Sequence, residues 1–168
     1  HPPMLRWEWS ALILLIAVAA VLRGVRLGRI PYNLGGDEGT QLVIGLDLLN
    51  TPLGNPFATG WYSVPTMSFF AYGLVMRILG ATIAGGRALS VLIGVTTVIL
   101  TFFLGRSVGG RRIGWWSAIV LAGSAYHIHY SRLASNQIAD PWVGALAFGL
   151  LWLGYGAGDY RRDRKSVV

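Results

Sequence analysis

Four long apolar stretches contain no Asp, Glu, Lys or Arg, and charged residues bound each of them. They are Trp9–Leu22, Ala88–Gly105, Ile113–Ser131 and Pro141–Gly158. A helix needs roughly 20 apolar residues to cross a bilayer, and a helix satisfies its own backbone hydrogen bonds there. Only 12% of the residues are charged, against about 25% in soluble domains. We therefore expect an all-α, polytopic membrane protein with transmembrane helices over 9–25, 87–105, 113–131 and 141–157.

The formal net charge is +7, and this excess of cationic side chains has two readings. We do not expect nucleic-acid binding, because no basic stripe is interleaved with aromatic residues on a soluble surface. The arginines flank apolar spans instead, which indicates a lipid bilayer as partner. The sequence has no cysteine and therefore no disulfide or thiolate metal site.

The basic clusters predict the topology. One lies between the second and third spans, and the other follows the fourth span, at 161–165. Positive residues concentrate on the cytoplasmic side. We expect a multi-pass protein of the inner (plasma) membrane, with cytoplasmic termini, a basic tail over 158–168, and external loops at 26–86 and 132–140. Arg23, Arg26 and Arg29 then oppose the rule, which indicates either a bound anion or headgroup, or snorkelling at the interface.

The first external loop is far from polar. Residues 38–50 place leucines and a valine on one helical face, and Asp37 is a suitable N-cap for this helix. A second apolar run, 66–79, follows a Pro- and Gly-rich stretch. We expect two helices that lie along the outer membrane surface, because a fifth span would move both basic clusters outside.

Two external loops carry the candidate functional residues. The first brings Asp37 and Glu38, and the second brings Arg132, Asn136 and Asp140. A carboxylate at a low-dielectric boundary can act as a general base, and several carboxylates can hold a divalent cation. An arginine can bind a phosphate through its fork of donors.

Simpler interpretations stand beside these functional ones. Asp37 can be an N-cap only, and Arg132 and Asp140 can be the interfacial ends of two spans. His127 and His129 are two residues apart on a helix and face nearly opposite ways, which disfavours a shared metal. The stretch GRSVGGRR lacks the GK[ST] ending of a phosphate loop and predicts a tight cytoplasmic turn.

The order of the motifs carries a family resemblance. An apolar anchor and GGDEGT precede WYSVPTMSFFAYGLVMRILG, and GGRALSVLIGVTTVILTFFLGRSVGGRRIGWWSAIVLAGSAYHIHYSRLASNQIADP follows. This set resembles the N-terminal part of GT-C glycosyltransferases, in the protein-mannosyltransferase-like, family 39 group that includes the aminoarabinose transferases. The resemblance covers nearly the whole chain. Members of that group are several times longer, so the chain is expected to be the N-terminal portion of a transferase.

The resemblance implies an activity and roles for the candidate residues. Such enzymes transfer a sugar from a polyprenyl-phosphate donor to an acceptor hydroxyl at the outer face. By resemblance, Asp37 is the general base, Glu38 supports it or binds a divalent metal, and Asp140 orients substrate or shares that metal. Arg132 holds the loop or the donor phosphate, and Asn136 stands where some relatives carry an acid.

A second interpretation belongs to a different class. The chain is short and its helices carry small-residue faces, as expected of a non-catalytic accessory subunit that keeps a transferase-like fold in a larger membrane complex. Such a subunit would contact lipids or a pigment, with His127 or His129 as a single metal ligand. An ion or solute transporter is disfavoured, because none of the four apolar stretches contains an internal acid or base.

Overall fold

The computed structural model describes residues 3–50 and 66–165, and every regular element in them is a helix. Three helical segments are long and apolar enough to cross a membrane: Arg6–Gly24, Ile83–Gly123 and Asn136–Tyr155. The elements are α1 (Arg6–Gly24), α2 (Gly36–Asn50), α3 (Met67–Leu79), α4 (Ile83–Gly123), α5 (Ala125–Tyr130), η2 (Asn136–Ile138) and α6 (Ala139–Lys165). The all-α class expected from the sequence is confirmed, and the three long apolar helices are compatible with a membrane protein, whereas the expected count of four spans is not confirmed.

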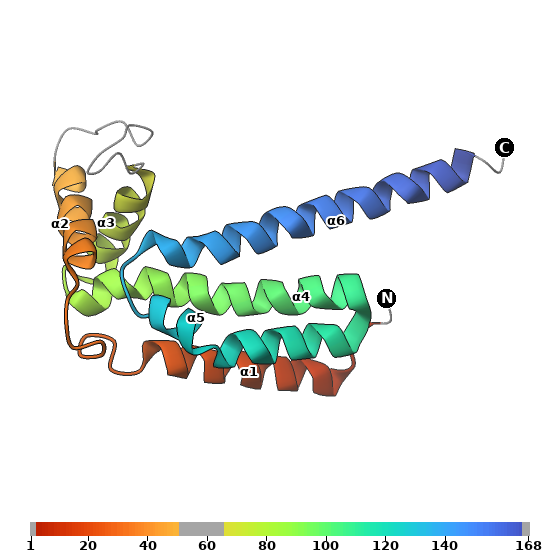
Figure 1. Cartoon of the computed structure of the whole chain (residues 1–168), viewed down its shortest axis with the longest axis horizontal. Helices are drawn as coiled ribbons and strands as arrows, with labels where there is room; N and C mark the ends of the chain where they lie inside the picture. The colour runs from red at the N-terminus through yellow and green to blue at the C-terminus, as the bar shows by residue number, and fades with distance from the viewer. Residues whose placement is uncertain (1–2, 51–65, 166–168) are drawn as a thin grey trace.

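Helix α4 reverses direction at Gly110, where φ is 80° and ψ is −173°. Only glycine adopts this backbone region readily. The two halves lie side by side in Figure 1, and the rings of Phe102 and Trp115 are 4.9 Å apart. In a straight helix, thirteen residues would separate them by about 20 Å. The turn expected from GRSVGGRR is therefore present at Gly110, within α4.

The main apolar core lies where α1 packs against both halves of α4. Its buried residues are Leu12, Ala19, Val98, Phe102, Ala118 and Ala122. Most of the large apolar side chains on the outside of this bundle are exposed, as expected of residues that face lipid.

Helices α2 and α3 form a pair that stands across one end of the bundle (Figure 1). Their backbones meet at Gly45 and Gly73, where a Cβ on either residue would collide with the backbone of the other helix. This close approach explains the two glycines. The two helices expected in the first external loop, at 38–50 and 66–79, are both present.

The two ends of the bundle are clearly separated in Figure 1. The Arg6 end of α1, the Gly110 turn and the Lys165 end of α6 lie at one end, which we call the turn end. Helices α2 and α3 and the segment 131–138 lie at the other, which we call the loop end. Helix α6 starts at the loop end and diverges from α4 along its length.

Three boundaries differ from the expected ones. Helix α2 starts at Gly36, so Asp37 lies in its first turn and is not the N-cap. The expected span over 113–131 is interrupted at Ser124, whose extended backbone separates α4 from α5. Helix α6 continues to Lys165, into the segment expected as a tail. Hydropathy locates apolar runs but not the local backbone changes that end a helix.

Candidate functional site at the loop end

Glu38 makes a buried, two-pronged ion pair with Arg87. Arg87 donates from Nε to Oε1 at 2.7 Å and from Nη2 to Oε2 at 2.8 Å. Both side chains are almost fully shielded from solvent. A fork-to-fork pair of this kind is among the strongest and most directional hydrogen-bonding arrangements in proteins. The carboxylate predicted as a catalytic or metal-binding group is therefore tied to α4.

The same ion pair gathers three chain segments. The Nη1 atom of Arg87 donates to the carbonyl oxygens of Leu27 and Pro31, at 3.0 and 3.1 Å. The backbone N–H of Ala134 donates to Glu38 Oε1 at 2.8 Å. Glu38 thus connects α2 to α4 and to the second loop, and its charge is compensated in place.

Tyr72 fixes the next residue of the second loop. Its hydroxyl lies 2.7 Å from Ser90 Oγ and donates to the carbonyl of Ser135 at 2.8 Å. Burial raises the pKa of Tyr72, so the hydroxyl keeps its proton. Two consecutive residues of the second loop, Ala134 and Ser135, are therefore held by α2 and α3, and these contacts also position the residues that follow.

A cavity of about 210 Å³ lies next to Ala134 and Ser135. It is lined by Asp37, Gln41, Phe69, Ala134, Ser135, Asn136 and Gln137. The residues come from α2, α3 and the second loop, so Asp37 and Asn136, from the two expected external loops, line one cavity. Asp37 is exposed, and it forms no hydrogen bond or ion pair with other residues in the described parts of the chain.

Gln41 is the lining residue that sequence reasoning missed. Its side chain is 5% exposed, and Nε2 has no hydrogen-bond partner among the described residues. A buried donor without a partner destabilises a fold by about 1–3 kcal/mol. Gln41 lies four residues after Asp37 on α2, so both share one helical face. That spacing was the available signal.

Arg132 and Asp140 have other surroundings. Arg132 is buried and donates to the carbonyl oxygens of Leu22, Val25 and Ile30, at 2.6 to 3.0 Å. Burial, and secondarily repulsion by Arg87, lower the pKa of its guanidinium. Asp140 is exposed in the first turn of α6 and does not line the cavity.

The predicted metal ligands are Glu38 and Asp140. Among the side chains that the structure describes, no group of three or more His, Asp or Glu residues could hold a metal ion. Both oxygens of Glu38 accept hydrogen bonds from Arg87. A divalent cation shared by Glu38 and Asp140 stays a prediction from the resemblance.

Arg23, one of the three arginines that oppose the positive-inside rule, has a structural explanation. Arg23 is completely buried and donates to the carbonyl oxygens of Ala19, Leu121 and Ala122. Its Nη2 atom lies 2.9 Å from His127 Nδ1. The burial of Arg23 contradicts the snorkelling interpretation for this residue, whereas Arg26 and Arg29 are exposed.

A second acidic centre, at the turn end, was not anticipated. Glu8 is buried; its Oε1 contacts Arg106 Nη1 at 3.1 Å and Arg111 Nε at 2.8 Å. Its Oε2 accepts from the backbone N–H of Leu5 at 2.8 Å. Two of the arginines that indicated topology are thus paired with an acid at the start of α1.

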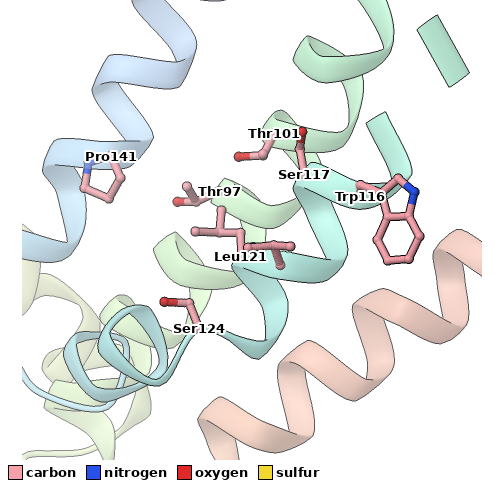
Figure 2. A pocket seen from close by; sticks show the side chains of 8 residues that line it. Thr97, Thr101, Trp116, Ser117, Leu121, Ser124 and Pro141 are labelled. Carbon is pink, nitrogen blue, oxygen red and sulfur yellow. The ribbon is translucent and has the colours of Figure 1, made fainter. Parts of the chain in front are cut away.

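A larger cavity, about 560 Å³, lies between the halves of α4 and the start of α6 (Figure 2). Figure 2 shows hydroxyl side chains on its wall, together with Trp116, Leu121 and Pro141. The hydroxyl residues are Thr97, Thr101, Ser117 and Ser124. This lining has no acid, base or arginine, so the cavity at the loop end is the better candidate for chemistry.

Comparison with known protein families, curated proteins and solved structures finds no match to the chain.

Proposed function

We propose that the chain is part of a membrane glycosyltransferase that uses a polyprenyl-phosphate sugar, with the loop-end cavity as its acceptor side. One observation supports this proposal most: the Asp37 carboxylate, which has no partner among the described residues, borders a cavity that the second loop also lines. A buried ion pair and a tyrosine hydroxyl fix that wall. The family resemblance carried by the order of motifs is the reason for proposing sugar transfer as the reaction.

The proposed step is a single displacement. The Asp37 carboxylate takes the proton of an acceptor hydroxyl as the acceptor oxygen forms a bond to the anomeric carbon. The bond between that carbon and the phosphate oxygen breaks with inversion, and polyprenyl phosphate leaves with the electron pair. A base in this position contributes roughly 10²- to 10⁴-fold to such a reaction.

The contacts favour different roles for the other predicted residues. In this proposal Glu38 positions the second loop, since Arg87 and Ala134 occupy its oxygens. Arg132 joins the end of α1 to the second loop through three carbonyls. Asn136 contacts the acceptor, and Asp140 would act on a donor outside the cavity.

The same proposal includes four membrane crossings, with the two halves of α4 counted separately, and the loop end outside the cell. The arrangement in Figure 1 supports it, because α1, both halves of α4 and α6 all run between the two ends of the bundle. The sugar donor and a larger complex are proposed partners.

The test is transfer by Asp37→Asn. Membranes containing the protein are given polyprenyl-phosphate mannose or polyprenyl-phosphate aminoarabinose, and the release of polyprenyl phosphate is measured. We expect Asp37→Asn to lose at least about 100-fold in rate. Val43→Ala, an exposed change on the same helix outside the cavity lining, should keep the wild-type rate. Unchanged turnover in Asp37→Asn would refute the proposal, and absence of release by the wild type would favour the accessory-subunit interpretation.

A further inference from the structure

The unpartnered amide of Gln41 raises the question of what the loop-end cavity is built to hold. A buried polar group normally has a hydrogen-bond partner, and an exception in a cavity wall indicates a missing ligand or solvent. The cavity, at about 210 Å³, far exceeds the roughly 10–15 Å³ of probe space that one water needs. It is smaller than the roughly 300–1,000 Å³ of drug-sized sites. Its size suits one small polar moiety.

The lining residues exclude an anionic moiety. Among the described residues that line the cavity there is no Lys or Arg, and the charged one is Asp37. The two arginines nearby in the fold are engaged elsewhere, Arg87 by Glu38 and Arg132 by backbone carbonyls. A phosphate placed here would meet a negative charge without a compensating cation.

The same residues suit a neutral, hydroxyl-rich moiety. A hydroxyl both donates and accepts, and side-chain amides do the same through their NH₂ and carbonyl groups. Gln41, Asn136 and Gln137 supply amides, Asp37 supplies an acceptor, and the buried ring of Phe69 supplies an apolar wall. A half-turn of the terminal amide of Gln41 exchanges its nitrogen and oxygen with little steric change.

We infer that Gln41 is a specificity-determining residue that binds a hydroxyl of a neutral sugar or polyol in this cavity and that the cavity rejects phosphate. The inference rests on the proposed function for its place in a reaction, and it deepens that function by naming the ligand class of the acceptor side. The contact itself requires only the cavity and its lining.

The experiment measures binding by saturation-transfer NMR. The protein is purified in a detergent without a sugar headgroup and titrated with methyl α-mannoside, methyl β-glucoside or inorganic phosphate. We expect at least one glycoside to bind and phosphate not to bind. Gln41→Met keeps the side-chain length without the amide and should weaken glycoside binding roughly five- to tenfold, the worth of one hydrogen bond. Val43→Ala, an exposed change on the same helix, should bind as the wild type does.

Two further variants keep the result interpretable. Gln137→Ala alters an exposed lining residue and should also weaken binding, which covers the case in which Gln41→Met does not fold. Asp37→Asn should lose transfer but retain glycoside binding, since an amide still forms hydrogen bonds. If the wild type binds a glycoside but shows no sugar transfer, the proposed function is refuted and the inference about Gln41 stands. Binding of phosphate instead of a glycoside, no glycoside binding, or unchanged binding by Gln41→Met and Gln137→Ala would overturn the inference.

Discussion

Both ends of the bundle contain a buried glutamate paired with arginine, but of these two glutamates only Glu38 has a second acid next to it in the sequence. At the turn end, Glu8 contacts Arg106 and Arg111 and caps the start of α1. At the loop end, Glu38 pairs with Arg87, and the adjacent Asp37 stays exposed at a cavity. Each glutamate joins segments that are distant in sequence.

The difference shows that neighbouring acids can have separate roles. The carboxylate oxygens of Glu38 accept hydrogen bonds from Arg87 and Ala134, so Glu38 positions the wall of the cavity. Asp37 has no such partner in the described residues and is available to a ligand. The turn end has the ion pair without an adjacent acid, and it therefore serves as an internal control for the structural part of the arrangement.

The largest effect is expected from Glu38→Gln. The variant leaves Arg87 buried without a counter-charge, and breaking such a pair typically costs about 3–5 kcal/mol in unfolding free energy. Thermal unfolding in detergent measures the loss. The double variant Glu38→Leu with Arg87→Met should recover part of it, because both charges are removed together. Equal stability of Glu38→Gln and the wild type would contradict the role assigned to Glu38.

Glu8→Gln should lower the unfolding temperature less than Glu38→Gln does. One of its partners, Arg111, is 40% exposed and can be solvated when the ion pair is lost. The variant should leave glycoside binding and sugar transfer unchanged, because the turn end is remote from the cavity. A change in ligand binding without a loss of stability would show that the two ends are coupled, contrary to the comparison.

Gly110→Ala tests the backbone reversal that creates the turn end. A side chain at φ 80° and ψ −173° is strained, so we expect a loss of about 1–3 kcal/mol in unfolding free energy. Gly123→Ala is the matched control, because a Cβ there meets nothing within 4 Å and its φ is ordinary. Chemical denaturation of the two variants gives the comparison, and equal stabilities would argue against the reversal.

Tyr72→Phe should have the smallest effect on stability and a specific effect on the loop end. It removes the hydroxyl that contacts Ser90 and Ser135, at a cost of about 1–2 kcal/mol. Hydrogen exchange at the amides of Asn136 and Gln137 should become faster, because the second loop loses one of its anchors. Unchanged exchange in the second loop, with exchange at the turn end as reference, would show that Glu38 alone positions the wall.

Much of the fold follows from the sequence, because apolar runs and their flanking charges are long-range averages. They predicted the helical membrane class and the pair of helices in the first loop. The reversal of α4 was visible in the two glycines of GRSVGGRR. The break at Ser124 was not, because a single residue with extended backbone leaves the hydropathy of its surroundings unchanged.

The site was harder to predict, because sequence shows which groups are present and not which are already paired. Asp37 and Asn136 do border one cavity. The partners of Glu38 and Arg132 lie far away in the chain, at Arg87 and at carbonyls within and just after the last turn of α1. Gln41 could not be singled out, because a lone glutamine in a sequence indicates no particular chemistry. Its importance follows from its burial without a hydrogen-bond partner, which the sequence does not show.

The separate roles of the two acids are tested most directly by the thermal unfolding midpoint of Asp37→Asn beside that of Glu38→Gln, in the same detergent. Asp37→Asn should have a midpoint near that of the wild type. Glu38→Gln should show a drop of roughly 10 °C, the scale expected from a loss of about 3–5 kcal/mol in a chain of this size. Equal drops, or a larger drop in Asp37→Asn, would contradict the assignment of one acid to structure and the other to chemistry.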